Sequence, residues 1–174
     1  MTELGDRLLA ASYLEGDFVL RSGVHSSFYL DKYLFETRPD LLRDIAAGLR
    51  AKLAAHEPFD LLAGPELGAV ALVAALSLAC EKPFVIVRKG EKGYGTKRLL
   101  EGHAEAGQRA LVVEDIVTSG GAALQAVHVL REAGLEVAGV LCVVDREQGG
   151  REAFAAEGVV LDPLFTASGL GIKV

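Results

Sequence analysis

The sequence predicts an α/β fold in which a central, mostly parallel sheet is flanked by helices and preceded by a small N-terminal helix and β-hairpin. Short apolar runs alternate with segments of helical periodicity along most of the chain. One run, residues 137–144, is almost continuously apolar, which is typical of a strand buried on both faces of a parallel sheet. The 174 residues, 51% of them hydrophobic, have the size and composition of a single domain, residues 1–174.

The N-terminal segment, residues 1–35, is expected to form a small hood on the core. Leucines at helical spacing are followed by two short runs of strand-forming residues on either side of Ser22 and Gly23, a pair that favours a turn. This pattern predicts one helix and one β-hairpin. The helix is expected at residues 2–14 and the two strands at residues 18–21 and 27–30.

The core, residues 36–174, shows the alternation of elements that builds a parallel sheet. Pro39 is a favourable first residue for a helix, and that helix is expected to end before Pro58. In folds of this order, ligands bind at the carboxyl ends of the strands. Strands are expected at residues 59–63, 84–87, 110–113, 137–144 and 159–161, and helices at residues 39–56, 69–79, 120–133 and 151–156.

Charge and composition exclude several classes of protein. The net charge of −6 argues against general binding to nucleic acid, which depends on cationic side chains. The longest apolar stretch, residues 67–80, is too short to span a bilayer, and charges within residues 1–17 interrupt the apolar segment that a secretory signal needs. Cys80 and Cys142 are too far apart for a CxxC motif and suit a reducing compartment. We therefore expect a soluble, cytoplasmic protein that binds neither nucleic acid nor membranes.

The most specific pattern in the chain covers residues 111–122. An apolar strand leads to two adjacent acids, Glu114 and Asp115, and a small polar turn at residues 118–120 then leads into a helix. Free N–H groups at such a helix start hold phosphates. The acids would repel a phosphate unless the same ligand offers hydroxyl donors or a metal ion, and a ribose 5-phosphate offers a diol. Taken singly, the acids could also be an ordinary strand end and helix cap.

A second pattern, residues 88–98, combines five cations with one acid and three glycines. The glycines argue against a helix, so a mobile loop is expected at residues 88–103. Such a charge run could simply be a solvated surface. Beside a phosphate site it could instead close over a departing diphosphate, where lysine ammonium groups neutralise developing charge and the closed loop excludes water.

The string at residues 111–122 resembles the phosphoribosyl-diphosphate (PRPP) binding motif of type I phosphoribosyltransferases. The order Arg-Lys-x-x-Lys-x-Tyr-Gly from residue 88, followed by Glu101 and Gly102, is similar to orotate phosphoribosyltransferases. Three further segments agree with that family: a hairpin at residues 18–23, a diphosphate loop at residues 64–65 and a base-recognition strand end at residues 144–150.

The resemblance covers residues 18–150 and implies both fold and reaction. The fold it implies is that of the type I phosphoribosyltransferases. The reaction is transfer of the 5-phosphoribosyl group from PRPP to orotate, giving orotidine 5′-monophosphate and diphosphate in the biosynthesis of UMP, a pyrimidine nucleotide.

The same resemblance implies which residues form the site. Three are expected to be catalytic: Lys92, Glu114 and Asp115. The residues expected to bind PRPP are Arg21, Arg88, Lys89, Lys92, Tyr94, Glu114, Asp115, Ile116, Val117, Thr118, Ser119, Gly120, Gly121 and Ala122. Those expected to bind orotate are Tyr29, Leu30, Thr118 and Arg146. A planar guanidinium suits the orotate carboxylate, although Arg146 could instead form a surface ion pair with Asp145.

The resemblance also implies a homodimer and a metal cofactor. Lys92 and Tyr94 are expected to enter the site of the neighbouring subunit. Mg²⁺ is expected to be held mainly by the diphosphate of PRPP and by water. No metal site on the protein is expected, and the four histidines show no metal-ligand spacing.

Three segments depart from the commoner family pattern. Tyr94 stands where many members have histidine, so proton transfer by this residue is in question, although tyrosine still donates a hydrogen bond. Leu67 and Gly68 stand where many members carry a lysine, which leaves diphosphate binding there to backbone N–H groups. Leu30 replaces a frequent aromatic residue.

Other functions remain as alternatives at this point. A phosphoribosyltransferase for another base would keep the acidic string but would not need the hairpin, the loop cations and Arg146 together. A PRPP-sensing regulatory protein without turnover would be expected to lose the loop cations or to gain a DNA-binding segment. A plain nucleotide-binding α/β protein is disfavoured because no GxGxxG follows a strand.

Overall fold

The computed structural model describes residues 2–19, 25–90 and 99–172. Its strands are β1 (Tyr13–Val19), β2 (His25–Leu30), β3 (Leu61–Pro65), β4 (Phe84–Val87), β5 (Leu100–Glu101), β6 (Arg109–Val117), β7 (Glu136–Asp145) and β8 (Leu161–Thr166). Its helices are α1 (Glu3–Ser12), α2 (Tyr33–Glu36), α3 (Pro39–Arg50), α4 (Ala69–Cys80), α5 (Gly121–Glu132) and α6 (Gly150–Ala156), with a 3₁₀ turn at Leu53–Ala55.

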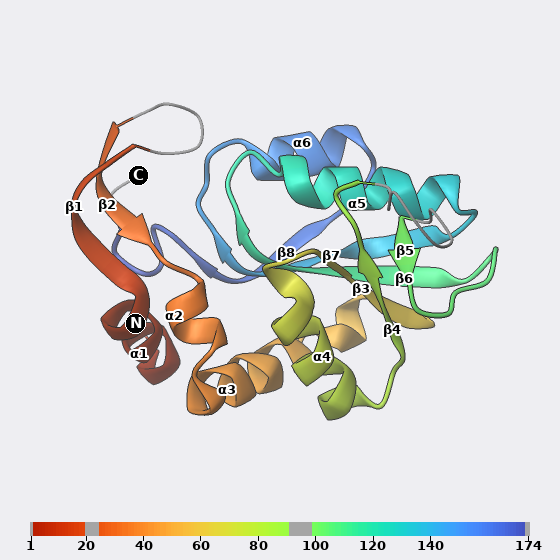
Figure 1. Cartoon of the computed structure of the whole chain (residues 1–174), viewed down its shortest axis with the longest axis horizontal. Coiled ribbons are helices and arrows are strands. Elements are labelled where there is room, and N and C mark those ends of the chain that lie inside the picture. Colours follow the sequence, from red (N-terminus) through yellow and green to blue (C-terminus); the bar gives the residue numbers. More distant parts are fainter. Residues whose placement is uncertain (1, 20–24, 91–98, 173–174) are drawn as a thin grey trace.

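Six strands form the central sheet in the order β5-β4-β3-β6-β7-β8, and β1 and β2 form a separate hairpin (Figure 1). β5 runs antiparallel to β4, whereas the other neighbouring pairs of the sheet are parallel. Helices cover both faces, with α5 and α6 on one side and α3 and α4 on the other (Figure 1). The predicted α/β class with a mostly parallel sheet is confirmed.

Alternation along β6 explains why the sheet has a core on each face. Leu111 and Val113 pack in the cluster that includes α1 to α4, whereas Ala110 and Val112 pack in the cluster beneath α5 and α6. All four side chains are fully buried. The central part of a parallel strand between two helical layers therefore needs consecutive apolar residues, which is the pattern of residues 110–113 in the sequence.

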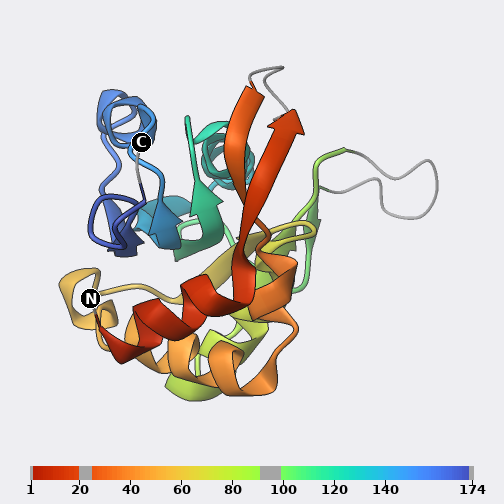
Figure 2. The same cartoon turned by 90° about the vertical axis from the view of Figure 1, so that its left-hand side faces the viewer.

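The hairpin rises beside the sheet and is joined to the core through its base (Figure 2). β1 and β2 pair antiparallel, with Tyr13 opposite Leu30, and the register shifts between Glu15 and Phe18. Leu8 of α1 and Phe35 of α2 are fully buried in the same apolar cluster as the central sheet. The hood thus shares the core of the protein on one side and leaves the hairpin projecting on the other.

Several expected boundaries were wrong. The first helix ends at Ser12 rather than residue 14, because Tyr13 already pairs with Leu30 in the hairpin. The last strand is β8 rather than residues 159–161, because the Val159 N–H donates to the Phe154 carbonyl and closes the end of α6. Gly158 has a positive φ of 68°, as such a helix end requires.

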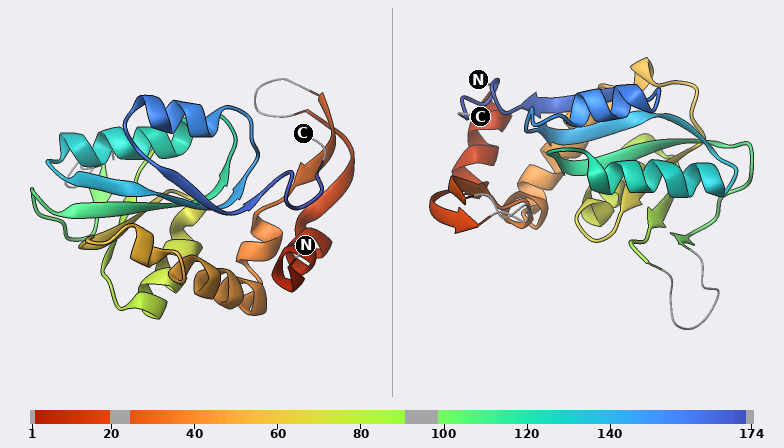
Figure 3. Two further views of the ribbon diagram at one scale, coloured as in Figure 1. Left: turned by 180° about the vertical axis from the view of Figure 1, so that it is seen from behind. Right: turned by 90° about the horizontal axis from the view of Figure 1, so that it is seen from above.

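Two short elements, α2 and β5, were not predicted. The views from behind and above place α2 between the hairpin and α3 (Figure 3). No helix within the described ranges is long and apolar enough to cross a membrane.

Candidate functional site

Two adjacent acids lie near the carboxyl end of β6, one of the two central strands of the sheet. Glu114 is 5% exposed and Asp115 is 2% exposed. The Asp115 backbone N–H donates to Glu114 Oε1 at 3.0 Å, and the Ile116 N–H donates to Asp115 Oδ1. These bonds hold both carboxyl groups close to the strand that carries them.

Burial shifts the protonation of this pair. Burial first, and the charge of Asp115 second, raise the pKa of Glu114 well above its ordinary value. Such a pair carries less negative charge near neutral pH than two exposed carboxylates would. In a buried carboxyl pair with one raised pKa, the ionised group can accept hydrogen bonds from a diol and the protonated group can donate one to it.

The turn after β6 leads into an open helix start. Thr118 and Ser119 are exposed, and Gly120 has a positive φ of 83° and no side chain that could cap α5. The first N–H groups of α5 are therefore available to an anion, and the helix dipole favours one. Gly150 of α6 supports this turn, since a Cβ there would lie 2.7 Å from the Thr118 carbonyl oxygen.

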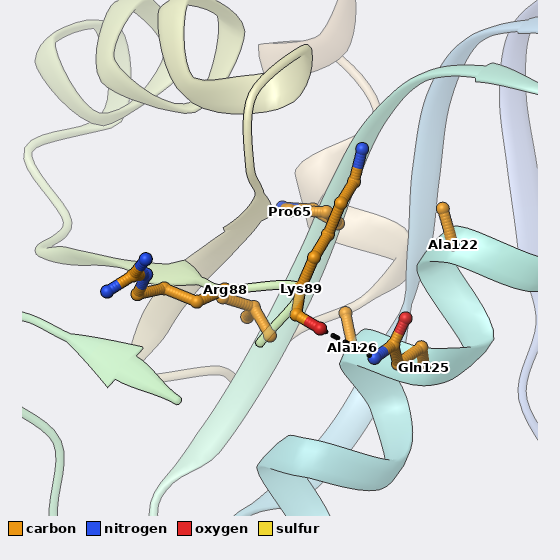
Figure 4. A pocket seen from close by; sticks show the side chains of 7 residues that line it. Pro65, Arg88, Lys89, Ala122, Gln125 and Ala126 are labelled. Carbon is orange, nitrogen blue, oxygen red and sulfur yellow. Dashed lines mark hydrogen bonds between the residues drawn. The ribbon is translucent and has the colours of Figure 1, made fainter. Parts of the chain in front are cut away.

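Two predicted site residues follow β4 and point in different directions. The Arg88 guanidinium lies 3.3 Å from Glu66, which follows β3, and 3.7 Å from Glu101 of β5. Lys89 instead extends past Pro65 towards the start of α5 (Figure 4). Its carbonyl accepts a hydrogen bond from Gln125 at 3.4 Å.

These two residues also border a small pocket near the helix start. The pocket is lined by Pro65, Val87, Arg88, Lys89, Ala122, Gln125 and Ala126 (Figure 4). Lys89 is thus positioned to place positive charge near an anion held by α5.

Arg146 directly follows β7 and is buried rather than superficial. It is 8% exposed, and its Cζ lies 5.0 Å from the centroid of the Phe28 ring in the hairpin. Burial lowers the pKa of Arg146 from its ordinary value. Asp145 pairs with Arg151 at 3.3 Å, so the alternative of a surface ion pair between residues 145 and 146 is wrong.

The hairpin supplies one exposed and one buried candidate. Tyr29 is 41% exposed and lies 5.6 Å from Phe18, ring to ring, whereas Leu30 is 5% exposed and packs in the apolar core. Alternation along β2 explains the difference. Leu30 therefore offers a ligand its backbone rather than its side chain.

Three predicted residues, Arg21, Lys92 and Tyr94, lie outside the described residues. Within the described ranges, no group of three or more His, Cys, Asp and Glu side chains is arranged to hold a metal ion. Of the other candidates, residues 114–122 and Arg146 lie at the ends of β6 and β7 and the start of α5, Arg88 and Lys89 follow β4, and Tyr29 and Leu30 lie in the hairpin. The Arg146 N–H donates to the Val117 carbonyl at 2.8 Å and joins the two strand ends.

Sequence reasoning missed two residues, Lys32 and Glu36, at the edge of this site. Lys32 Nζ lies 2.6 Å from Asp115 Oδ2. Glu36 is 3% exposed, and burial first, then the Asp115 charge, raise its pKa to about 8. No local pattern marks either residue, because their partners lie far away in the chain.

Comparisons with known proteins agree with this geometry. Residues 36–160 match the model of the phosphoribosyl transferase domain. The chain is 46% identical to the orotate phosphoribosyltransferase of Methanocella arvoryzae over 97% of this chain and 96% of that protein.

Two solved structures are also similar to this chain. The orotate phosphoribosyltransferase of Aeropyrum pernix matches with a TM-score of 0.87 and 31% identity, over 96% of this chain and 95% of that one. The Mycobacterium tuberculosis enzyme in complex with PRPP matches with a TM-score of 0.82 and 33% identity, over 98% of each chain.

Proposed function

The chain belongs to the phosphoribosyl transferase family, with orotate phosphoribosyltransferases among its relatives, and we propose that it transfers the 5-phosphoribosyl group of PRPP to orotate. The products are orotidine 5′-monophosphate and diphosphate, and the step belongs to pyrimidine biosynthesis. One observation carries this proposal: the buried Glu114 and Asp115 lie near the carboxyl end of β6, and the turn at residues 118–120 leads from this strand to the open start of α5. That arrangement suits a ligand with a diol and a phosphate.

PRPP binding is assigned to three parts of the site. The acids accept hydrogen bonds from the ribose hydroxyls, while residues 116–122 bind the 5-phosphate through backbone N–H groups and the hydroxyls of Thr118 and Ser119. Cations of the loop after β4 bind the diphosphate, together with Arg21 of the hairpin. The cations of this loop are Arg88, Lys89 and Lys92, and Tyr94 of the same loop is also assigned to PRPP binding. Lys89 is supported by its direction towards α5, whereas Arg88 would first have to leave Glu66 and Glu101.

Orotate binding is assigned to the space between the hairpin and the end of β7. Arg146 grips the orotate carboxylate with its planar guanidinium, beside Thr118. Tyr29 offers an exposed ring, and Leu30 offers backbone groups. The contact between Arg146 and Phe28 supports this assignment, because it brings the hairpin and β7 together.

The reaction proceeds by positioning and electrostatic stabilisation. The bond from C1 of the ribose to the diphosphate oxygen breaks as the sugar gains oxocarbenium character, and the orotate nitrogen attacks from the opposite face. The electron pair of the broken bond leaves with the diphosphate, whose charge Lys92 neutralises. The nitrogen is acidic enough to lose its proton to water before it attacks as an anion, so no general base on the protein is assigned.

Mg²⁺ is proposed as the cofactor, bound mainly by the diphosphate and water. Magnesium is usually held by substrate phosphates with few protein ligands, and this fits the pocket beside Lys89, whose lining residues include no acid; Glu66 lies nearby, where it accepts a hydrogen bond from the Lys89 N–H. When bound, it supplies positive charge to the leaving group.

The protein is further proposed to act as a homodimer in which Lys92 and Tyr94 enter the partner's site. It is also proposed to be cytoplasmic, since Cys80 and Cys142 are free. Residues 1–35 and 36–174 serve as hood and core of one domain.

The test is an assay of purified protein with PRPP, Mg²⁺ and orotate, which follows the loss of orotate absorbance. Uracil, hypoxanthine and adenine serve as parallel bases, and a chelator removes the metal. Turnover specific for orotate and dependent on Mg²⁺ is expected. Turnover with another base instead, or binding of PRPP without turnover, would contradict the proposal.

A further inference from the structure

An ammonium group from the hood reaches the acids of the site. Lys32, which directly precedes α2, donates from Nζ to Asp115 Oδ2 at 2.6 Å, across 83 residues of sequence. The Asp115 side chain is 4% exposed and that of Lys32 is 30% exposed. The contact is therefore a partly buried ion pair, which is less screened than one on the open surface.

The loop after β3 leaves the space that this ammonium needs. A Cβ at Gly68 would collide with both Asp115 Oδ2 and Lys32 Nζ. Three separate segments thus meet at one point: the residue before α2, the loop that leads into α4, and the end of β6. The glycine fits the close approach of the lysine to the acid.

Acidic groups surround Lys32. Burial lowers the pKa of Lys32, but the charge of Asp115 and its hydrogen bond, followed by the charges of Glu114 and Glu36, outweigh burial and raise it. Lys32 therefore stays protonated at neutral pH. Within the described residues, no other lysine or arginine forms an ion pair with Asp115.

We propose that Lys32 is a positioning residue that orients the Asp115 carboxylate and offsets its charge, so that the acid pair can receive the ribose of a polyanionic substrate. This inference rests on the proposed function. Two acids near a diphosphate and a phosphate repel the substrate, and a fixed cation on one of them reduces the repulsion. An oriented carboxylate also meets the ribose hydroxyls without first having to reorganise.

The first test compares two lysines of equal exposure. Lys32→Met removes the ammonium from Asp115, and Lys52→Met removes one from Asp162, where the pair distance is 2.7 Å and the lysine is also 30% exposed. We expect Lys32→Met to raise the KM for PRPP about tenfold, with a smaller change in kcat and in the KM for orotate. Lys52→Met should change none of them, and Lys32→Arg should recover part of the loss. A folded Lys32→Met protein with the wild-type KM for PRPP would overturn the inference.

A double-mutant cycle then asks whether Lys32 acts through Asp115. Calorimetry measures binding of PRPP with Mg²⁺ to wild type, Lys32→Met, Asp115→Asn and the double variant. We expect Lys32→Met to weaken binding about tenfold in the wild-type background and less than twofold beside Asp115→Asn. Equal losses in both backgrounds would overturn the positioning role. Binding decides this question even in a protein without turnover, so failure of the proposed transfer reaction is distinguishable from failure of this inference.

Discussion

At the scale of single residues, the surroundings of Arg146 position its guanidinium for a planar anion such as orotate. Its guanidinium lies over Phe28, whose ring in turn stacks on Tyr13 with centroids 5.4 Å apart and an angle of 15°. The contact with Phe28 restricts the movement of the guanidinium, and burial removes part of its water. A planar donor held in this way can bind a carboxylate through two parallel hydrogen bonds at little entropic cost.

Replacing the Arg146 guanidinium with the ammonium of lysine keeps the positive charge and tests the role of the planar group in orotate binding. We expect Arg146→Lys to raise the KM for orotate about tenfold, because an ammonium cannot form the paired bonds or stack in the same way, and to change the KM for PRPP less than twofold. Steady-state kinetics with each substrate varied in turn measures both constants. Arg131→Lys, an exposed arginine that pairs with Glu157 at 3.1 Å, is the control. An unchanged KM for orotate would remove the assigned contact.

Some of these residues could be predicted from sequence and others could not. Glu114 and Asp115 follow an apolar run inside β6, and Arg146 directly follows β7, so a local pattern locates them near the edge where ligands bind. No local sequence pattern identifies Lys32, since its partner Asp115 lies 83 residues away and the space for its ammonium depends on Gly68. Contacts between distant segments are set by packing, which a local pattern does not contain.

At the scale of elements, α2 is a short helix that brings charge into the site from the hood. Its four residues are too few for a periodic pattern, which explains why the sequence did not predict it. Strands β3, β4, β6 and β7 of the sheet were predictable because each contains a short apolar run. β8 was misplaced because Pro163 interrupts its pattern, yet an edge strand tolerates proline.

The buried carboxyl group of α2 gives the protein a specific pH dependence. Burial first, then the charges of Asp115, Glu114 and Asp31, raise the pKa of Glu36 to about 8 from an ordinary value of 4.5, against the opposing effect of Lys32. Below about pH 4.5 the group is neutral in both states. As pH rises towards 8, the unfolded chain ionises while the folded protein keeps the proton, so this group progressively lowers the free energy of unfolding.

Glu36→Gln removes that penalty and should stabilise the protein only at high pH. We expect its melting temperature to match wild type at pH 4.5 and to exceed it by roughly 5 °C at pH 9. Thermal unfolding followed by circular dichroism at both pH values measures the difference. Glu132→Gln, at an exposed position of α5, provides the control. A stability difference that is the same at both pH values would contradict the raised pKa.

At the scale of the whole molecule, the hood and the core contact each other at the site through an ion pair and a cation–π contact. Lys32 binds Asp115 and Phe28 lies against Arg146, so the hood contacts the ends of both β6 and β7. One chain therefore builds the acid pair, the open helix start and the buried arginine by itself. The proposed contribution from a partner is limited to the loop residues Lys92 and Tyr94.

If one chain supplies the acids of a site and the partner supplies Lys92, two inactive variants should complement each other. Lys92→Ala removes the leaving-group cation, and Asp115→Ala removes a ribose acceptor, so each homodimer should have little activity. In a mixed dimer, one site combines Asp115 of the first subunit with Lys92 of the second and is intact, whereas the other site has both defects. Random pairing of equal amounts should therefore restore about a quarter of the wild-type activity per subunit.

The measurement is an orotate assay on subunits mixed at varying ratios after reversible dissociation or co-expression. Activity should peak at equal amounts and fall to zero towards either pure variant. Mixing Lys92→Ala with Glu114→Ala should give the same result, whereas mixing Asp115→Ala with Glu114→Ala should not, because both defects then lie in the part of the site that each chain builds for itself. Activity that never exceeds the sum of the two variants, in a sample shown to contain mixed dimers, would mean that each subunit supplies its own Lys92. The site would then be complete within one chain.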